Sequence, residues 1–546
     1  MSNPTFTDIH CHPDLKTFLS ANDEINRINC WQNLNLPIIL KIIDRILLGN
    51  ILESQSSLTQ LNSSCGTIRL VGLYAFEKSM IKGDLFKILG IHVNLLTVAG
   101  ILEIMGHHRK IDYELLKRIS SPRTNYFRLF NEVQTHLVES ETIPPGYNIL
   151  NKINDHDPGM LNLIFTIEGG HNLFNKRAGY NFKKDVLSNL SDLKSGIYRY
   201  LFMGLAHLER NRLCTHAYGI KILHHRRFKP VGRGITRLGR KVIKKALSKP
   251  NRILIDIKHM SLEARKQYYE ILKQDYGSEN IPIIASHTGV TGRSYENMPV
   301  ITCKAYCKWT KVQYYQPEGL MCTKFNPWSI NLYDEEIMKI VDSDGLIGLN
   351  LDERILGTKQ KKRAELIEYF SRKEFSCCKY RRDHPAESHI QDPEEELSES
   401  ELLADKIRNK LLDYIHLVAQ NPYRFRDHDH LNNEIVNLYN DLLIIPRQLL
   451  DNDIKHLCNN ILHIVKVAGD KAWKHICIGS DFDGLINAVE CCRDATKMNK
   501  LARELKKWLP IMVASNPTLS PVTNIDQKVE DIMSRNACDF LKNNFN

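Results

Sequence analysis

Two histidines near the amino terminus are spaced so that one metal ion could bind both. His10 and His12 lie two residues apart in a short, mostly apolar segment. Side chains alternate between the two faces of an extended strand, so both imidazoles would point the same way. Imidazole nitrogens are common zinc ligands. The pair could equally be two polar residues at a strand end, because such spacings arise by chance in a chain with 22 histidines.

Further residues of metal-binding type follow short apolar runs. They are Glu168, His259, His287 and Asp481. Each has an ordinary explanation on its own: a solvated glutamate, a hydrogen-bonded structural histidine, or an aspartate in a turn. Two glycines after Glu168 permit a sharp exit of the backbone beside a ligand, and a carboxylate can bridge two metal ions. Taken together, the set favours a metal centre.

The apolar runs before these residues predict β-strands. Eight candidates can be counted, at 6–9, 68–73, 161–167, 199–205, 252–257, 281–285, 345–349 and 475–479. Most are separated by helical patterns, which predicts an α/β fold, a (β/α)₈ TIM-type barrel. Active sites of such barrels lie at the carboxyl ends of the strands. The candidate ligands follow the first, third, fifth, sixth and eighth strands, so they should meet at that end.

The chain is longer than a minimal barrel of about 250 residues, so we treat it as a single barrel, residues 1–546, with long insertions. We expect loop insertions at 13–66 and 288–330, and a charged helical insertion at 358–450. The second carries aromatic residues that could shape the substrate pocket or pack a small core of their own. They are Tyr306, Trp309, Tyr314, Tyr315 and Trp328.

Composition limits the environment and the partners. No charge-free run approaches the roughly 20 apolar residues that span a bilayer, and a strand so near the amino terminus leaves no room for a signal peptide. The 14 cysteines form no regular framework, so we expect reduced thiols and a cytoplasmic protein, with export by another route left open. The net charge of +11 could attract nucleic acid, but a solvated basic face is the favoured explanation.

Several motifs together resemble the membrane (renal) dipeptidase family of the amidohydrolase superfamily. The most specific are the Glu-Gly-Gly-His sequence at 168–171 and the Gly-Ser-Asp-Phe-Asp-Gly sequence at 479–484. The other matching segments are 8–12, 200–207, 234–239, 256–261, 282–287, 461–469 and 532–540. The resemblance covers nearly the whole barrel and leaves out the insertions.

The resemblance implies a site with two Zn²⁺ ions that hydrolyses a dipeptide or similar small amide by means of a metal-bridging hydroxide. By position, one ion would be held by His10, His12, Glu168 and Asp481, the other by His259 and His287, with Glu168 bridging. Asp481 would carry the proton from water to the leaving amine, and His207 would contact the substrate and its transition state. His207 could also be an ordinary buried histidine. The family often forms homodimers.

Two departures from the family pattern bear on the substrate. The family usually has Asp where this chain has His12, which would leave the site with a charge of about +1 rather than 0 and favour anionic groups nearby. The family also places an Arg where it can hold the dipeptide carboxylate, and residues 329–334 contain none. Arg293 and Arg354 are the candidates to replace it as a carboxylate clamp.

Two other functions remain open. A metal-dependent nuclease of the TatD type also uses a barrel and a His-x-His pair, and the positive charge favours it, whereas the two specific motifs and the length argue against it. A non-catalytic barrel used as a binding module would not need all six candidate ligands. The favoured interpretation is a zinc-dependent dipeptidase acting on a small peptide, with no nucleic acid, no membrane span and a possible homodimer.

Overall fold

The structure is a computed structural model. It describes residues 6–21, 28–35, 53–63, 67–82, 86–88, 91–93, 110–140, 146–175, 182–219, 226–298, 300–358, 366–383, 448–516 and 522–546, with scattered residues within 41–44, 403–413 and 433–440.

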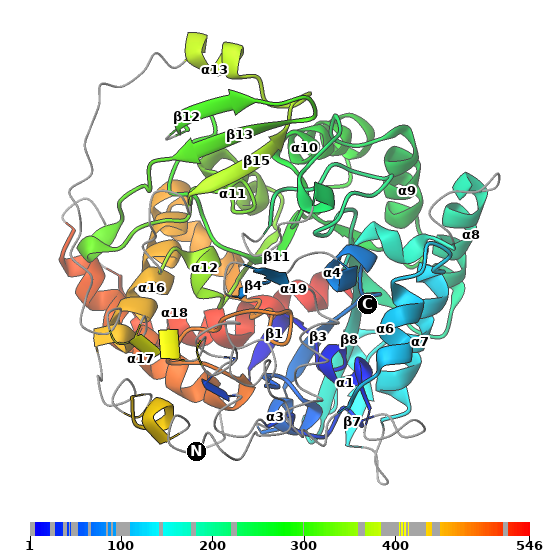
Figure 1. The fold of residues 1–546 in the computed structure, drawn as a ribbon, viewed down its shortest axis with the longest axis horizontal. Coiled ribbons are helices and arrows are strands. Elements are labelled where there is room, and N and C mark those ends of the chain that lie inside the picture. The colour runs from blue at the N-terminus through cyan, green and yellow to red at the C-terminus, as the bar shows by residue number, and fades with distance from the viewer. Residues whose placement is uncertain are drawn as a thin grey trace.

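Eight parallel strands close into a barrel, which confirms the predicted fold (Figure 1). The order of the strands around the ring follows their order in the chain. The ring is closed because the third strand, β8, pairs with every residue of the second strand, β3. The strands are β1 (Thr7–Cys11), β3 (Ile68–Leu73), β8 (Leu161–Ile167), β9 (Tyr200–Gly204), β10 (Leu254–Asp256), β11 (Ile284–Thr288), β14 (Leu346–Leu349) and β16 (Ile476–Ile478). Every residue of these strands is buried, as expected for parallel strands that read as continuous apolar runs.

The strand boundaries differ from the prediction in three places that bear on the site. β1 continues to Cys11, so His10 lies inside this strand and not after it. β11 continues to Thr288, because Thr288 pairs with Leu349 beyond an irregularity in the ladder. His287 therefore lies inside a strand and not after it. At the eighth strand, residues Asp470–His475 form a 3₁₀-helix, so β16 begins only at Ile476.

Helices surround the barrel and pack through one apolar face each. Those after the strands include α8 (Phe182–Ser195), α9 (Arg237–Leu247), α10 (Leu262–Tyr276), α11 (Asp334–Asp342), α16 (Gln448–Ala468) and α17 (Met498–Ala514). In α9 the buried residues include Leu238, Val242 and Ala246, which recur at the helical period. The helix begins where the Thr236 hydroxyl accepts a hydrogen bond from the Gly239 amide.

The amino-terminal end of the barrel is covered by the last helix. In α19 (Asn536–Asn544), Phe540 and Leu541 line the same apolar space as Ile9 and Leu70 from two barrel strands. This side is therefore packed with side chains, and the chemistry is left to the opposite, carboxyl-terminal end.

A second, antiparallel sheet lies beside the barrel, at the top of Figure 1. It consists of β12 (Val300–Ala305), β13 (Trp309–Tyr314) and β15 (Ile367–Ser371). Two segments that we expected to be separate insertions, 288–330 and 358–450, thus contribute to one sheet. The sequence analysis did not predict this pairing.

The aromatic residues of this region pack a small core. Tyr314 and Trp328 are buried there with Tyr218 and Phe370. For these two residues the structure therefore favours the small core over a lining of the substrate pocket. Most of the charged helical insertion expected at 358–450 lies outside the described residues.

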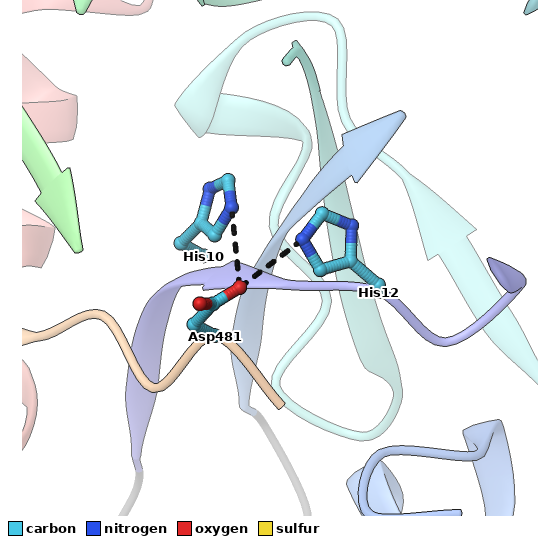
Figure 2. A group of neighbouring side chains, drawn as sticks. All are labelled: His10, His12 and Asp481. Atoms are coloured by element: carbon cyan, nitrogen blue, oxygen red, sulfur yellow. Dashed lines mark ion pairs between the residues drawn. The ribbon is translucent and has the colours of Figure 1, made fainter. Parts of the chain in front are cut away.

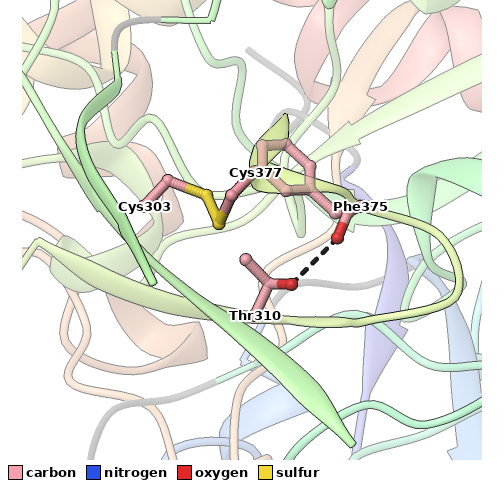
Figure 3. The surroundings of a disulfide bond; sticks show 4 residues. All are labelled: Cys303, Thr310, Phe375 and Cys377. Atoms are coloured by element: carbon pink, nitrogen blue, oxygen red, sulfur yellow. Dashed lines mark hydrogen bonds between the residues drawn. A yellow bond between two sulfur atoms is a disulfide. The ribbon is translucent and has the colours of Figure 1, made fainter. Parts of the chain in front are cut away.

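A disulfide bond fastens the small sheet to the helix that follows it. It joins Cys303 of β12 to Cys377, the first residue of α13 (Cys377–Asp383), and the Thr310 hydroxyl donates a hydrogen bond to the Phe375 carbonyl beside it (Figure 3). This bond departs from the expectation of reduced thiols throughout. Among the described residues, no helix combines the length and apolar character that crossing a bilayer requires.

Candidate metal centre

Glu168 lies at the centre of the predicted ligand set. It follows β8 directly, and its Oε1 atom is 3.4 Å from His10 Nε2, 3.2 Å from His259 Nε2 and 3.6 Å from His287 Nε2. Its other oxygen, Oε2, is 3.4 Å from His12 Nε2. A single carboxylate thus faces all four candidate histidine ligands, the position from which it could bridge two ions.

Asp481 completes the set from the eighth strand (Figure 2). Its Oδ1 atom is 3.4 Å from His12 Nε2 and 3.9 Å from His10 Nε2. Its other oxygen accepts a hydrogen bond from the Asn350 amide at 3.2 Å. That bond fixes the carboxylate with Oδ1 turned toward the histidines.

The donor atoms fit a bound cation. The Nε2 atoms of His10 and His12 are buried and have no hydrogen-bond partner among the described residues, although buried polar atoms are normally paired. His12 Nδ1 lies 2.6 Å from the Gly72 carbonyl, to which it donates, so in the neutral imidazole the lone pair that could bind a metal is on Nε2. Backbone bonds of this kind orient histidine ligands in metal sites.

The distances also match shared coordination. His259 Nε2 and His287 Nε2 are 3.1 Å apart. Two nitrogens bound to one tetrahedral zinc at about 2.0–2.1 Å would be separated by about 3.3 Å. Three groups keep their donor atoms within 4.8 Å of one another: His10, His12 and Asp481; His10, Glu168 and His287; and Glu168, His207 and His259. Since Glu168 belongs to two of them, the arrangement fits more than one ion.

The charges and burial of the site favour positive charge beside His12 and neutral imidazoles at His259 and His287. Burial alone would lower the pKa of His12, but the charges of Glu168 and Asp481 raise it to about 9. The same negative potential would attract a metal cation. On the other side burial lowers the pKa of His259 to about 3 and also lowers that of His287. These two imidazoles are therefore neutral, the form that binds metal.

Backbone conformation at two ligands is unusual. His259 and Asp481 both adopt left-handed backbone conformations, with φ of 64° and 63°. Such conformations cost of order 1–3 kcal/mol for residues other than glycine. Each ligand follows its strand by three residues, so the turn brings the side chain over the barrel mouth.

Gly72 makes room for the two amino-terminal histidines. A methyl group on its Cα would lie 2.8 Å from Cε1 of both His10 and His12, closer than such atoms approach. The absent side chain at this position of β3 is therefore a requirement of the site.

Two aspartates below the ligands hold their backbone in place. Asp8 accepts hydrogen bonds from the Ser480 amide, at 2.9 Å, and from its hydroxyl, at 2.5 Å. Asp256 makes the same pair of bonds with Ser286, at 3.1 and 2.6 Å. Each serine directly precedes a candidate ligand, so each pair fixes the strand end from which that ligand projects.

His207 is brought to the centre from β9 and is held by a glutamate. Its Nε2 atom is 3.5 Å from Glu168 Oε1, and its Nδ1 atom is 2.7 Å from Glu77 Oε2. Burial alone would lower the pKa of His207, but Glu77 and Glu168 raise it to about 9. His207 thus carries a proton on Nδ1, and as an imidazolium it could also donate from Nε2.

The two arginines proposed as carboxylate clamps lie differently. Arg354 is tied up, because its Nε and Nη2 atoms donate to the Asp352 carboxylate and Nη2 also donates to the Leu485 carbonyl. Arg293 is exposed, and its backbone makes the hydrogen bonds that the structure shows for this residue. Among the described residues, no hydrogen bond or ion pair joins either arginine side chain to one of the six candidate ligands.

Sequence reasoning missed Glu77, Gly72 and Asn350. Glu77 follows the second strand and Asn350 directly follows the seventh, the two strands besides the fourth for which no ligand was predicted. The rule that functional side chains follow strand ends would have found both, had it been applied to polar residues of every strand. Gly72 gives no such signal, because its role depends on a neighbouring strand.

One protein family matches part of this chain. The family model of the membrane dipeptidases (Peptidase family M19) matches residues 321–509, so it bears out the resemblance over this part of the chain, which includes the motif at 479–484. A search of curated proteins finds no match. Among solved structures, the probable dipeptidase PvdM from Pseudomonas aeruginosa is 13% identical with a TM-score of 0.48, covering 99% of this chain and 95% of its own. A metallopeptidase from Rhodobacter sphaeroides, liganded with a phosphinate mimic of the dipeptide L-Ala-D-Ala, is 12% identical with a TM-score of 0.43, covering both chains fully, at 100% and 100%.

Proposed function

We propose that this chain, with its match to the membrane dipeptidases, is a zinc-dependent hydrolase that cleaves a dipeptide or a similarly small amide. The observation that carries the proposal is the convergence of four histidines on the single carboxylate of Glu168, with Asp481 facing two of them. The four are His10, His12, His259 and His287. Two Zn²⁺ ions bound there would lower the pKa of a water molecule and polarise the scissile carbonyl.

The ligands divide between two positions that share Glu168. His10, His12 and Asp481 form one compact group, and His259 and His287 face each other on the other side. Nitrogen and carboxylate donors of this kind suit zinc. Two ions are proposed because the two oxygens of Glu168 face different histidines.

The proposal gives the proton transfer to Asp481. Its side chain is 13% exposed, while the five other ligands are at most 8% exposed. With Oδ2 held by Asn350, Oδ1 remains to accept a proton from water and pass it to the leaving amine.

The proposal gives His207 the role of stabilising developing negative charge. Its Nδ1 donates to Glu77, which leaves Nε2 directed at the metal centre. A donor fixed in this way would steady the oxyanion of the tetrahedral transition state without having to reorganise. The deep burial of the site favours a small substrate.

Two conservative substitutions test the proposal. Glu168→Gln and Asp481→Asn should each lower kcat for a cleaved dipeptide by at least about 10²-fold. Asp470→Asn, which changes a carboxylate that is 88% exposed, should behave like the wild type. Near wild-type turnover in both site variants would refute the assignment.

A further inference from the structure

A lysine with a buried and unpaired ammonium group lies beside the metal centre. Lys258 directly precedes His259, and the residue is 3% exposed. Its Nζ atom is buried and has no hydrogen-bond partner among the described residues. A buried ammonium without a partner is costly, and proteins keep such a group where it meets a charge of opposite sign.

The neighbouring carboxylates do not neutralise this ammonium directly. Asp481, Asp256 and Asp352 are the acidic groups whose charges act on Lys258. None of them forms an ion pair with Nζ in the part of the chain that the structure describes. Asp352 is paired with Arg354, and Asp256 is bonded to Ser286.

The side chain belongs to the mouth of the barrel. Lys258 follows β10, and its amide donates to Asp256 Oδ1, one step below the ligand His259. Because Lys258 follows β10 by two residues, it lies at the carboxyl end of the barrel, the end at which Asp352 and Asp481 follow the seventh and eighth strands.

We infer that Lys258 binds the terminal carboxylate of the substrate. This rests on the proposed function, since a dipeptide must bring its carboxylate into the site along with the scissile amide. The rival cations are less suitable, because Arg354 already donates to Asp352 and Leu485 and Arg293 is exposed. An ammonium is a point charge with three donors that is less demanding of geometry than a guanidinium.

The test compares a carboxylate with its amide in the zinc-loaded protein. Alanine and alaninamide, each in L and D form, are titrated calorimetrically, and no turnover is needed because they are products or product analogues. The wild type should bind at least one form of alanine more tightly than the matching alaninamide. Lys258→Met should weaken alanine binding by about 10- to 100-fold and leave alaninamide unchanged. Lys258→Arg should recover part of the preference.

Control variants separate this role from a structural one. Lys266→Met removes the same charge from α10, where Nζ lies over the Tyr295 ring, and should not alter the preference. Lys258→Met should retain its zinc and should unfold at no lower temperature, because an unpaired buried charge has been removed. An unchanged preference in Lys258→Met, or its loss in Arg354→Met or Arg293→Met instead, would overturn the inference.

The outcome is distinguishable from failure of the proposed function. If no dipeptide is cleaved but alanine binding depends on Lys258, the carboxylate site stands and the reaction is assigned wrongly. If dipeptides are cleaved and Lys258→Met lowers kcat/KM equally for a dipeptide and its carboxyl-terminal amide, the reaction stands and the role of Lys258 is wrong.

Discussion

The carboxylate of Glu77 and the imidazole of His207 are joined by a hydrogen bond of 2.7 Å, in which Nδ1 donates to Oε2. The other oxygen of Glu77 accepts from the Glu209 amide at 3.0 Å. Burial alone would raise the pKa of Glu77, but His207 lowers it to about 2. Glu77 is therefore ionised and fixed at both oxygens, and it determines which nitrogen of His207 faces Glu168.

Replacing Glu77 should impair the transition state more than substrate binding. In Glu77→Ala, His207 loses its orienting partner, and we expect kcat to fall by about 10- to 100-fold with a small change in KM. Glu77→Gln, whose amide oxygen can still accept from Nδ1, should be affected less. Steady-state kinetics measure the split, with Glu114→Gln, a glutamate 79% exposed, as the control. If Glu77→Ala keeps the wild-type kcat, Glu77 has no catalytic role in orienting His207.

Gly72→Ala should weaken metal binding. The added methyl group would displace the rings of His10 and His12, from which it would otherwise lie 2.8 Å. We expect zinc affinity to fall at least about tenfold, measured by competition with a chromophoric chelator. Gly159→Ala, in an exposed turn where the methyl would meet only Asp157 Oδ1, at 3.2 Å, is the matched control. Equal zinc affinity in both variants would contradict the packing argument.

Glu368 should make the protein less stable as pH rises through the weakly acidic range. Burial raises its pKa from 4.5 to about 7, although hydrogen bonds from the Ser329 amide and hydroxyl oppose the shift. The folded protein thus holds this proton more tightly than the unfolded chain does. Its stabilising contribution is complete below about pH 4.5 and is lost as pH rises through about 7.

Urea unfolding across this pH range measures the effect. As pH rises through this range, the free energy of unfolding should fall less in Glu368→Gln than in the wild type. Glu318→Gln, at an exposed position, should keep the wild-type slope. The same slope in Glu368→Gln as in the wild type would show that Glu368 does not titrate in this range.

The Cys303–Cys377 disulfide should stabilise the small sheet. Replacing both cysteines by serine should cost about 2–4 kcal/mol and should increase hydrogen exchange in β12 and β13. Cys378→Ser, which alters the adjacent exposed and free cysteine, is the control. Unchanged exchange in the double variant would mean that the sheet does not depend on the bond.

Sequence reasoning predicted the barrel well because buried parallel strands are short, nearly continuous apolar runs. All eight strands are present, and their ends moved by at most three residues, as for β11. The meeting of the six candidate ligands could be predicted because parallel strands deliver their carboxyl ends to one place. The small sheet could not, because β15 is separated from β13 by more than fifty residues and its pairing depends on non-local contacts.

The contacts around the candidate ligands could not be predicted from the sequence either. The Glu77–His207 bond and the clearance at Gly72 arise between different strands, so no spacing within one segment encodes them. The engagement of Arg354 by Asp352 was a local possibility that a sequence cannot distinguish from a free clamp. The homodimer and the cytoplasmic location stay predictions.

The central claim is tested most directly by measuring metal content and hydrolysis on the same purified protein. Elemental analysis would be combined with a panel of dipeptides containing L,L and L,D forms. The account predicts about two zinc ions per chain and cleavage of at least one dipeptide. A correctly folded protein that binds no metal when supplied with zinc, and cleaves no dipeptide, would contradict it.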